Sequence, residues 1–196
     1  MIEPLDLGVC RAYHWAGDPD RVAVVLPGAM LGGMPAVAVP IYALRDRGWS
    51  AVQVWDEFLD RSLDATAWTR ERAEAALAAT GTAKTMLLVA KSLTTRAAAL
   101  AAERSLPAVW LTPLLDDEES VDGLRRRTAP ALLVGGTADP TWDGALARTL
   151  SEDVLELPEA DHAFGGPTGI ASLLGNFALI THAVDEFAAA LERDRG

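Results

Sequence analysis

The chain has 196 residues, of which half are hydrophobic, and carries a formal net charge of −11. A chain of this length and composition can bury one sizeable core, so we expect a single domain over residues 1–196 and neither a disordered nor a fibrous protein. The acidic charge repels phosphate backbones, which argues against nucleic acid as a partner. The sequence lacks the roughly 18 uninterrupted apolar residues of a membrane span, and its N-terminus lacks the pattern of a secretory signal, so a cytoplasmic protein without a membrane partner is expected.

Short apolar runs alternate with segments of helix-forming residues along the chain. Apart from a poorly patterned first run, each has the length of a strand that is buried on both faces. In chain order, the predicted elements are a strand at 7–15, a strand at 21–26, a helix at 40–47, a strand at 51–55, a helix at 65–80, a strand at 86–90, a helix at 96–104, a strand at 108–112, a helix at 118–127, a strand at 131–134, a helix at 142–150, a strand at 154–157, and one helix or a broken pair at 170–193. Pro40 in a first turn and Asp64 as a capping residue place two of the helices. The alternation predicts an α/β fold, a three-layer doubly wound and mostly parallel sheet with helices on both faces.

Cofactor and metal sites find no support in the sequence. The only cysteine, Cys10, cannot form a disulfide within the chain, and the three histidines are far apart in the sequence, without the spacing of metal ligands. The glycine-rich loop from Gly28 to Gly33 does not match the G-x-G-x-x-G pattern of a dinucleotide site, and residues 85–89, before Lys91 and Ser92, contain none of the glycines of a phosphate-binding loop. We therefore expect no metal and no cofactor.

The strand at 86–90 ends in a small-residue turn that carries Ser92 and leads into a helix. A buried strand, a sharp turn with one nucleophilic side chain and a helix make up a nucleophile elbow. The usual elbow has glycine two residues before and two residues after the serine, whereas this chain has Ala90 and Thr94. Taken alone, the stretch is explained equally well by a serine that caps an ordinary helix.

Two further polar residues directly follow predicted strands. In an open parallel sheet, functional residues gather in the loops at the carboxyl ends of the strands. Asp139 and His162 stand in such loops, and with Ser92 they follow the chain order Ser, Asp, His of one class of catalytic triad. Singly, Asp139 before Pro140 could begin a turn, and His162 could bond to Asp161. Their joint order and placement favour the triad.

Four motifs together resemble small bacterial members of the α/β-hydrolase superfamily. They are the loop G-G-T-x-D-P around Asp139, the loop D-H-x-F around His162, the loop L-P-G-A after an early strand, and the strand–Ser–helix elbow. The resemblance covers the chain from about residue 21 onward. It implies an α/β-hydrolase fold with a set of catalytic groups, which are the side chains of Ser92, Asp139 and His162 and the oxyanion-hole N–H groups of Leu93 and of Ala29 or Met30. Two features depart from the family pattern: the elbow lacks both glycines, and Pro27 stands where many members have histidine.

The resemblance implies a serine hydrolase that acts on a small-molecule ester or thioester through an acyl-enzyme intermediate. A serine needs a base to become a good nucleophile, which would be His162, with Asp139 holding the other ring nitrogen. Serine instead of aspartate or cysteine disfavours the dehalogenase, epoxide-hydrolase and dienelactone-hydrolase branches. The altered elbow motivates an alternative, a weakly active or inactive binding or interaction protein on the same fold.

The spacing of the later strands bears on access to the site. Only residues 113–130 separate two of the predicted strands, and one short acidic helix nearly uses them up, so we expect no cap domain. The site should then be a shallow, partly open groove with a rim formed by residues 30–34, 113–117 and 165–174. Trp142 is a candidate for the mouth of this groove, and Lys91 is expected to be a solvated neighbour of the elbow.

Overall fold

A computed structural model of the chain describes residues 1–30 and 32–193. These residues form an eight-stranded sheet with the strand order β1-β2-β4-β3-β5-β6-β7-β8. The strands are β1 (Ile2–Asp6), β2 (Arg11–Trp15), β3 (Asp18–Leu26), β4 (Trp49–Trp55), β5 (Thr85–Lys91), β6 (Ala108–Leu111), β7 (Ala131–Gly136) and β8 (Asp153–Leu157). The six strands from β3 to β8 pair in parallel, and the hairpin of β1 and β2 joins them antiparallel along β4.

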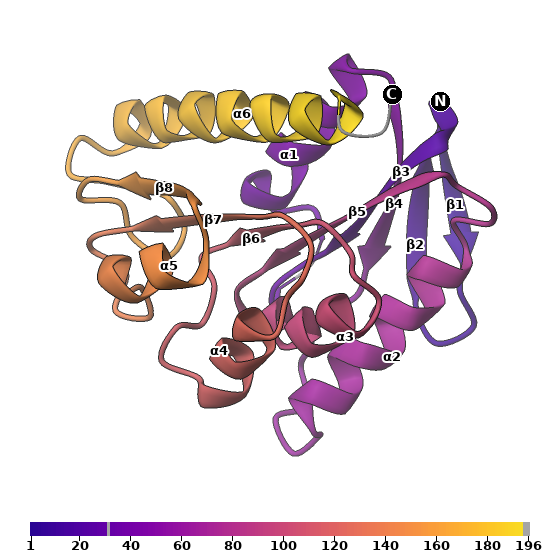
Figure 1. The fold of residues 1–196 in the computed structure, drawn as a ribbon, viewed down its shortest axis with the longest axis horizontal. Helices are drawn as coiled ribbons and strands as arrows, with labels where there is room; N and C mark the ends of the chain where they lie inside the picture. Colours follow the sequence, from indigo (N-terminus) through magenta and orange to yellow (C-terminus); the bar gives the residue numbers. More distant parts are fainter. Residues whose placement is uncertain (31, 194–196) are drawn as a thin grey trace.

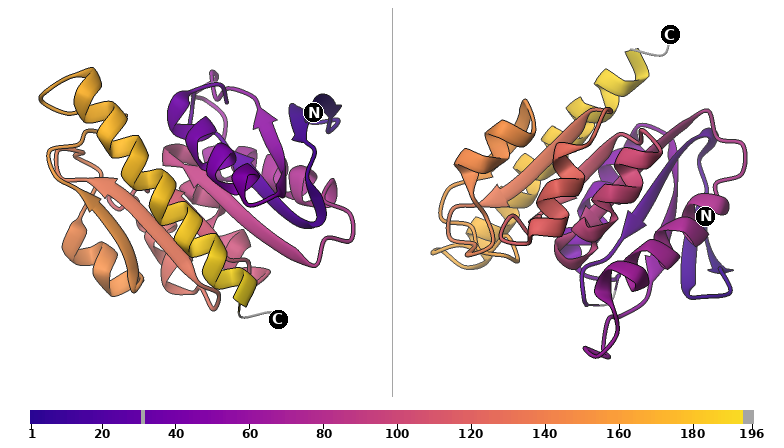
Figure 2. Two further views of the ribbon diagram at one scale, coloured as in Figure 1. Left: turned by 90° about the horizontal axis from the view of Figure 1, so that it is seen from above. Right: turned by 60° about the horizontal axis from the view of Figure 1, so that its bottom comes forward.

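Helices cover both faces of this sheet (Figure 1). One face carries α1 (Pro35–Asp46) and α6 (Ile170–Arg193), which lie side by side across the strands (Figure 2, left). The opposite face carries α2 (Ala65–Ala78), the 3₁₀ turn η1 (Ser92–Ala97), α3 (Ala98–Glu103), α4 (Glu118–Arg125) and α5 (Gly144–Leu150). The expected three-layer, mostly parallel α/β architecture is confirmed.

The alternation of side chains along β5 explains why both faces must be covered. Leu88 and Ala90 point into the core beneath α2 and α3, whereas Leu87 and Val89 point into the core beneath α1 and α6. All four are fully buried. Because successive side chains of a strand point to opposite faces, a continuous apolar run is stable only between two helical layers.

Two elements differ from the sequence-based expectation, and a third decides between two alternatives. The chain begins with a hairpin: only the second half of the edge strand expected at 7–15 is a strand, β2, and it pairs with β1, which lies before residue 7 and was not expected. Helix α1 begins at Pro35 and contains Pro40 in its interior, so the start expected at Pro40 is wrong. The last segment is one unbroken helix, α6, which selects between the two alternatives that the sequence left open.

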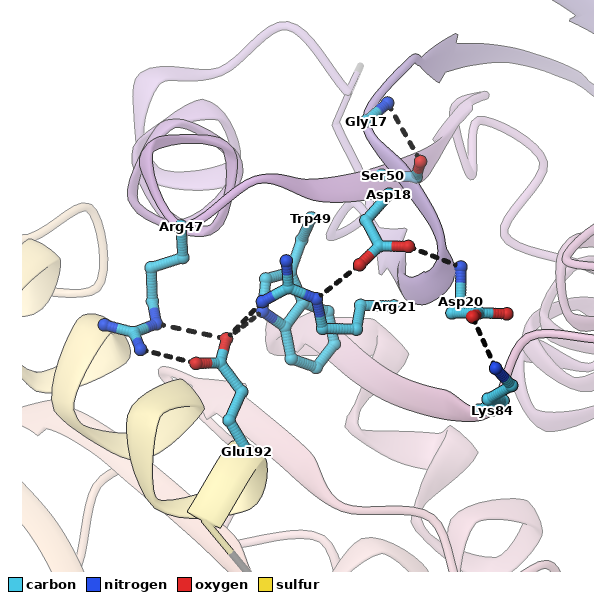
Figure 3. A network of polar contacts seen from close by, with 9 residues as sticks. All are labelled: Gly17, Asp18, Asp20, Arg21, Arg47, Trp49, Ser50, Lys84 and Glu192. Carbon is cyan, nitrogen blue, oxygen red and sulfur yellow. Dashed lines mark hydrogen bonds and ion pairs between the residues drawn. The ribbon is translucent and has the colours of Figure 1, made fainter. Parts of the chain in front are cut away.

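A polar cluster fixes the C-terminal end of α6 to the rest of the fold (Figure 3). Glu192 accepts hydrogen bonds from the guanidinium of Arg47 at 2.5 and 3.3 Å, from the indole of Trp49 at 2.8 Å and from Arg21 at 2.9 Å. These partners come from the end of α1 and from β3 and β4. One carboxylate therefore joins α6 to the elements beneath it.

The connection between β6 and β7, where a cap domain could be inserted, is short. Between β6 and β7 the chain forms only α4, so the expectation of a fold without a cap domain is confirmed. Within residues 1–30 and 32–193, none of the helices has an apolar stretch long enough to cross a bilayer.

Candidate active site

Ser92 stands at the sharp turn between β5 and η1. Its φ angle is 52°, in the left-handed region that non-glycine residues rarely adopt. This conformation turns the chain directly from the strand into a helix and raises the serine above the carboxyl edge of the sheet. The geometry is that of a nucleophile elbow, not of a serine that merely caps a helix.

Thr94 stands where the usual elbow has its second glycine, and its side chain bonds to the backbone of the turn. Its side chain is 1% exposed, and its hydroxyl oxygen lies 3.0 Å from both the backbone N and the backbone O of Lys91. The Lys91 N–H donates to this hydroxyl, and the hydroxyl can donate back to the Lys91 carbonyl. A threonine at this position therefore ties the turn together where most elbows rely on a small residue.

The side chains of Ser92, His162 and Asp139 form one hydrogen-bonded chain. Nε2 of His162 lies 2.7 Å from the Ser92 Oγ, and Nδ1 lies 2.7 Å from Oδ2 of Asp139. An ionised carboxylate can only accept, so the Nδ1 nitrogen must carry a proton, which leaves Nε2 free to accept the proton of the serine. The loops after β5, β7 and β8 thus bring together the three residues in the geometry of a nucleophile, a base and an acid that orients the base.

Asp139 is held as a carboxylate. It is 3% exposed, and this burial opposes ionisation, but the hydrogen bonds from His162 and from the backbone and hydroxyl of Thr141 outweigh the burial and lower the pKa of Asp139 below its ordinary value. Oδ1 accepts from Thr141, while Oδ2 faces the imidazole. One oxygen of Asp139 therefore holds the turn while the other holds the imidazole.

The loop that carries His162 is shaped by its neighbour. Oδ1 of Asp161 accepts from the backbone N–H groups of Ala163 and Gly165, both at 2.8 Å. Asp161 therefore organises the turn, and the imidazole of His162 bonds to Asp139 instead of to Asp161. Phe164, which is completely buried with a φ angle of 65°, anchors the loop against the core.

A pocket of about 500 Å³ opens beside Ser92. Its polar wall consists of Lys91, Ser92 and His162, and all its other residues are apolar or glycine. The other lining residues are Gly28, Ala29, Met30, Met34, Pro35, Ala36, Val37, Ala163, Gly165, Leu173 and Phe177. The serine and the histidine thus face a cavity suited to an apolar group.

The loop after β3 forms one wall of this pocket and is held from below. A Cβ at Gly28 would lie 3.4 Å from the Ser92 Cβ, so the loop passes directly against the elbow. The Ala29 carbonyl accepts from the N–H of Phe58 at 3.0 Å, and the Gly32 carbonyl accepts from the amide of Gln53 at 2.7 Å. These contacts bring the backbone of Ala29 and Met30 to the pocket beside Ser92, while Leu93 follows the serine in η1.

Sequence reasoning missed Gln53, Thr141 and Lys91. Gln53 is 2% exposed in the otherwise apolar β4, and a polar residue within such a run is a signal that could have revealed it. Lys91 was expected to be solvated, but its ammonium donates to the Thr112 hydroxyl at 2.8 Å and to the His162 carbonyl at 2.9 Å. That expectation is wrong, because the side chain is folded into the site.

Part of the expected rim lies elsewhere. Residues 113–117, all of which the structure describes, do not line the pocket, whereas Phe177 of α6 does. Leu31 in the expected rim segment 30–34 is outside the described residues. Trp142 is also not part of the pocket wall: its indole donates to Glu156 at 2.9 Å, and its ring covers Gly135 so closely that any Cβ there would overlap it.

Metal ligation has no obvious place in this arrangement. Among residues 1–30 and 32–193, there is no group of three or more histidine, cysteine, aspartate or glutamate side chains placed to hold a metal ion.

Comparison with known proteins yields likenesses in structure. No protein-family model matches the chain, and no curated protein matches it in sequence. Among similar solved structures are Est1E from Butyrivibrio proteoclasticus (TM-score 0.76, 12% identity, 98% of this chain and 99% of that chain) and an α/β serine hydrolase homologue from Coxiella burnetii (TM-score 0.72, 14% identity, 95% of this chain and 96% of that chain). Another is XC6422 from Xanthomonas campestris, described as an α/β serine hydrolase without a lid (TM-score 0.69, 17% identity, 95% of this chain and 94% of that chain). Likeness at this coverage, together with the strand order and the elbow, shows that the chain has the α/β-hydrolase fold.

Proposed function

We propose that this protein is a serine hydrolase that cleaves a small-molecule ester or thioester through an acyl-enzyme intermediate. The observation that carries the proposal is the hydrogen-bonded chain from Ser92 through His162 to Asp139, placed at the mouth of an apolar pocket. The likeness in fold to solved structures described as α/β serine hydrolases supports the same class of reaction.

Each group has a definite part in the proposed reaction. The Ser92 Oγ attacks the carbonyl carbon while Nε2 of His162 takes the serine proton. The imidazolium that forms is stabilised by the Asp139 carboxylate, whose lowered pKa keeps it ionised. The imidazolium then gives its proton to the leaving alcohol or thiol, and the acyl group stays on Ser92. In the second half, His162 takes a proton from a water molecule while the water oxygen attacks the acyl carbonyl carbon. The bond from that carbon to the Ser92 Oγ then breaks, Oγ takes the proton back from His162, and the acid leaves.

The charge that develops on the carbonyl oxygen needs hydrogen-bond donors. We assign this role to the backbone N–H of Leu93 and to that of Ala29 or Met30. The close passage of Gly28 over the elbow supports the assignment, because it brings the second loop within reach of the same oxygen. Loss of one such donor typically costs about 2.7–4 kcal/mol of transition-state stabilisation.

The pocket argues for the kind of substrate. Its walls offer Met30, Met34, Leu173 and Phe177 and few polar groups, so binding should come from burial of an apolar portion of the substrate. We therefore expect simple apolar esters and thioesters to be preferred over highly polar ones.

A fluorophosphonate probe tests the proposal directly. The probe should label the wild-type protein at Ser92, and the label should vanish in Ser92→Ala. Ser105→Ala is a matched control, because Ser105 is also a serine with a positive φ angle, at 49°, but lies in an exposed turn. A folded wild-type protein that stays unlabelled at neutral pH, and that does not hydrolyse p-nitrophenyl butyrate, would overturn the proposal in favour of a non-catalytic binding protein.

A further inference from the structure

The side chain of Lys91 connects three of the loops that build the site. Lys91 immediately precedes the serine at the end of β5. Its ammonium donates to the hydroxyl of Thr112 after β6 and to the backbone carbonyl of His162 after β8. It also lies 5.5 Å from the centre of the Phe164 ring, in the same loop as the histidine. One cation thus holds segments that are about 20 and 70 residues away in sequence.

The surroundings of the Lys91 ammonium disfavour a positive charge. Both hydrogen bonds of the Lys91 ammonium go to neutral oxygens, and among the ion pairs of the described residues none includes Lys91. Desolvation lowers the pKa of Lys91 to about 8, although the carboxylates of Asp139 and Asp161 act in the opposite direction. A partly buried cation without a carboxylate partner contributes little to stability, so its presence next to the nucleophile calls for another explanation.

Backbone strain gathers around the same ammonium. In the described residues, five non-glycine residues have positive φ angles, and three of them belong to this cluster. The φ angle is 52° at Ser92, which follows Lys91, and 42° at Thr112, whose hydroxyl accepts from the Lys91 ammonium. It is 65° at Phe164, whose ring lies next to the same ammonium. The remaining two, at 105 and 159, lie in exposed turns. Strained residues persist only where surrounding contacts hold them, and such clusters occur at functional sites.

The imidazole itself has little other support. The His162 side chain is 40% exposed, so packing alone does not fix it. Its ring is aligned by Asp139, and the backbone of its loop is held by Asp161 and by the amide of Asn176, which donates to the Phe164 carbonyl. The bond from Lys91 is the one that fixes the histidine's own carbonyl to the strand that carries the serine.

We propose that Lys91 is a positioning residue whose ammonium ties the backbone of His162 and the strained Thr112 to the nucleophile strand, and so keeps the imidazole aligned with Ser92. The inference rests on the proposed function, because alignment matters only if the serine is to be deprotonated. A displacement of about 1 Å at a catalytic group can lower a rate about 100-fold, so a tether of this kind has a measurable effect.

Lys91→Met tests the tether by removing the ammonium while keeping a long apolar side chain. Saturation kinetics of fluorophosphonate labelling give a rate constant for reaction and a constant for initial binding. We expect the rate constant to fall about 10- to 100-fold and the binding constant to change less than threefold. The chain has only one other lysine, so Lys84→Met is the matched control: Lys84 is exposed, bonds to Asp20 at 2.7 Å, and should leave both constants unchanged.

Restoring the charge separates positioning from general damage to the fold. In a Cys10→Ala background, Lys91→Cys provides one thiol, which 2-bromoethylamine alkylates with release of bromide to give a side chain of lysine's length that ends in an ammonium. Alkylation should recover most of the lost labelling rate, and the Cys10→Ala protein treated in the same way should not change.

The outcomes are distinct. If the wild-type protein is not labelled at Ser92, the proposed function fails and the role of Lys91 fails with it. If the wild type is labelled and a folded Lys91→Met protein is labelled at the same rate, only the positioning role is overturned. If alkylation restores the ammonium without restoring the rate, the positioning role is likewise overturned.

Discussion

The two oxygens of the Asp139 carboxylate have different partners, so a substitution can change one contact and keep the other. Oδ1 accepts from Thr141 and holds the turn, whereas Oδ2 faces Nδ1 of His162. In Asp139→Asn, the amide oxygen can keep the bonds to Thr141, but the amide nitrogen then donates towards Nδ1 and forces the proton onto Nε2. We expect a folded protein whose kcat for p-nitrophenyl butyrate is lower by about 10⁴-fold.

Asp143→Asn is the matched control for this prediction. Asp143 caps α5 through a 2.9 Å bond from the N–H of Leu146, a role that asparagine also fills well. The control should keep both its activity and its thermal midpoint. Turnover by Asp139→Asn at the wild-type rate would remove Asp139 from the mechanism.

Thr94 offers a second prediction at the scale of a single residue. In Thr94→Val, the shape is conserved, but the N–H of Lys91 loses its acceptor at a buried position. An unsatisfied buried donor costs about 1–3 kcal/mol, so the free energy of unfolding in urea should fall by that amount. Thr94→Ser, which keeps the hydroxyl, should lose much less. A Thr94→Val protein that is as stable as the wild type would show that the hydroxyl does not hold this turn.

At the residue scale, the sequence indicated which three side chains come together but not the groups around them. The placement of Ser92, Asp139 and His162 could be predicted because each lies in the segment after an apolar strand, and parallel strands bring their carboxyl ends to one edge. The contacts of Lys91 depend on how the loops after β6 and β8 pack against it, and no local pattern encodes that packing.

At the scale of the elements, α6 is fixed to the sheet by Glu192. Hydrogen bonds from Arg47, opposed by burial and helped by Trp49, lower the pKa of Glu192 to about 2. A carboxyl whose pKa is lower in the folded than in the unfolded protein stabilises the fold above the unfolded pKa, and this contribution is lost as the pH falls towards the folded pKa. Glu192→Gln should therefore lower the free energy of unfolding by about 1–3 kcal/mol at pH 7, allowing for partial solvent screening.

The pH dependence distinguishes this ionic contribution from a general effect on helix packing. The difference between wild type and Glu192→Gln should shrink as the pH is lowered from about 4.5 towards 2, the window set by the two pKa values. Urea unfolding at pH 7 and at pH 3 measures it. Glu186→Gln on the exposed side of the same helix should change little at either pH, because its partner His182 is also exposed. A difference for Glu192→Gln that does not depend on pH would rule out the ionic explanation.

The elements that sequence reasoning misplaced share a physical cause. β1 is largely exposed and is held by backbone bonds to β2, so its side chains show no buried alternation that could reveal it. The cap of α1 is Met34, which makes no side-chain hydrogen bond, and Pro40 therefore gave the stronger but misleading start signal. The buried strands and the capped helix α2 were predicted within a few residues, because burial and capping are written into their own side chains.

At the scale of the whole molecule, the surface around the pocket is apolar and uncovered. Met30, Met34, Ile170 and Leu174 are between 42% and 67% exposed, and they come from the loop after β3 and from the start of α6. Neither segment belongs to an inserted domain that could close over Ser92. In the part of the chain that the structure describes, no inserted segment covers the pocket.

This architecture predicts that the protein shows no interfacial activation. The rate with tributyrin should rise hyperbolically with concentration and pass smoothly through the solubility limit, because no lid has to open at the surface of an emulsion. Binding of short esters should also be weak, with a high KM, since an uncovered pocket buries only part of a small substrate. A water-miscible ester measured over the same range provides the baseline for saturation without an interface. A sharp increase in rate with tributyrin alone, beginning at its solubility limit, would mean that a segment such as the start of α6 covers Ser92 in solution and moves away at the interface.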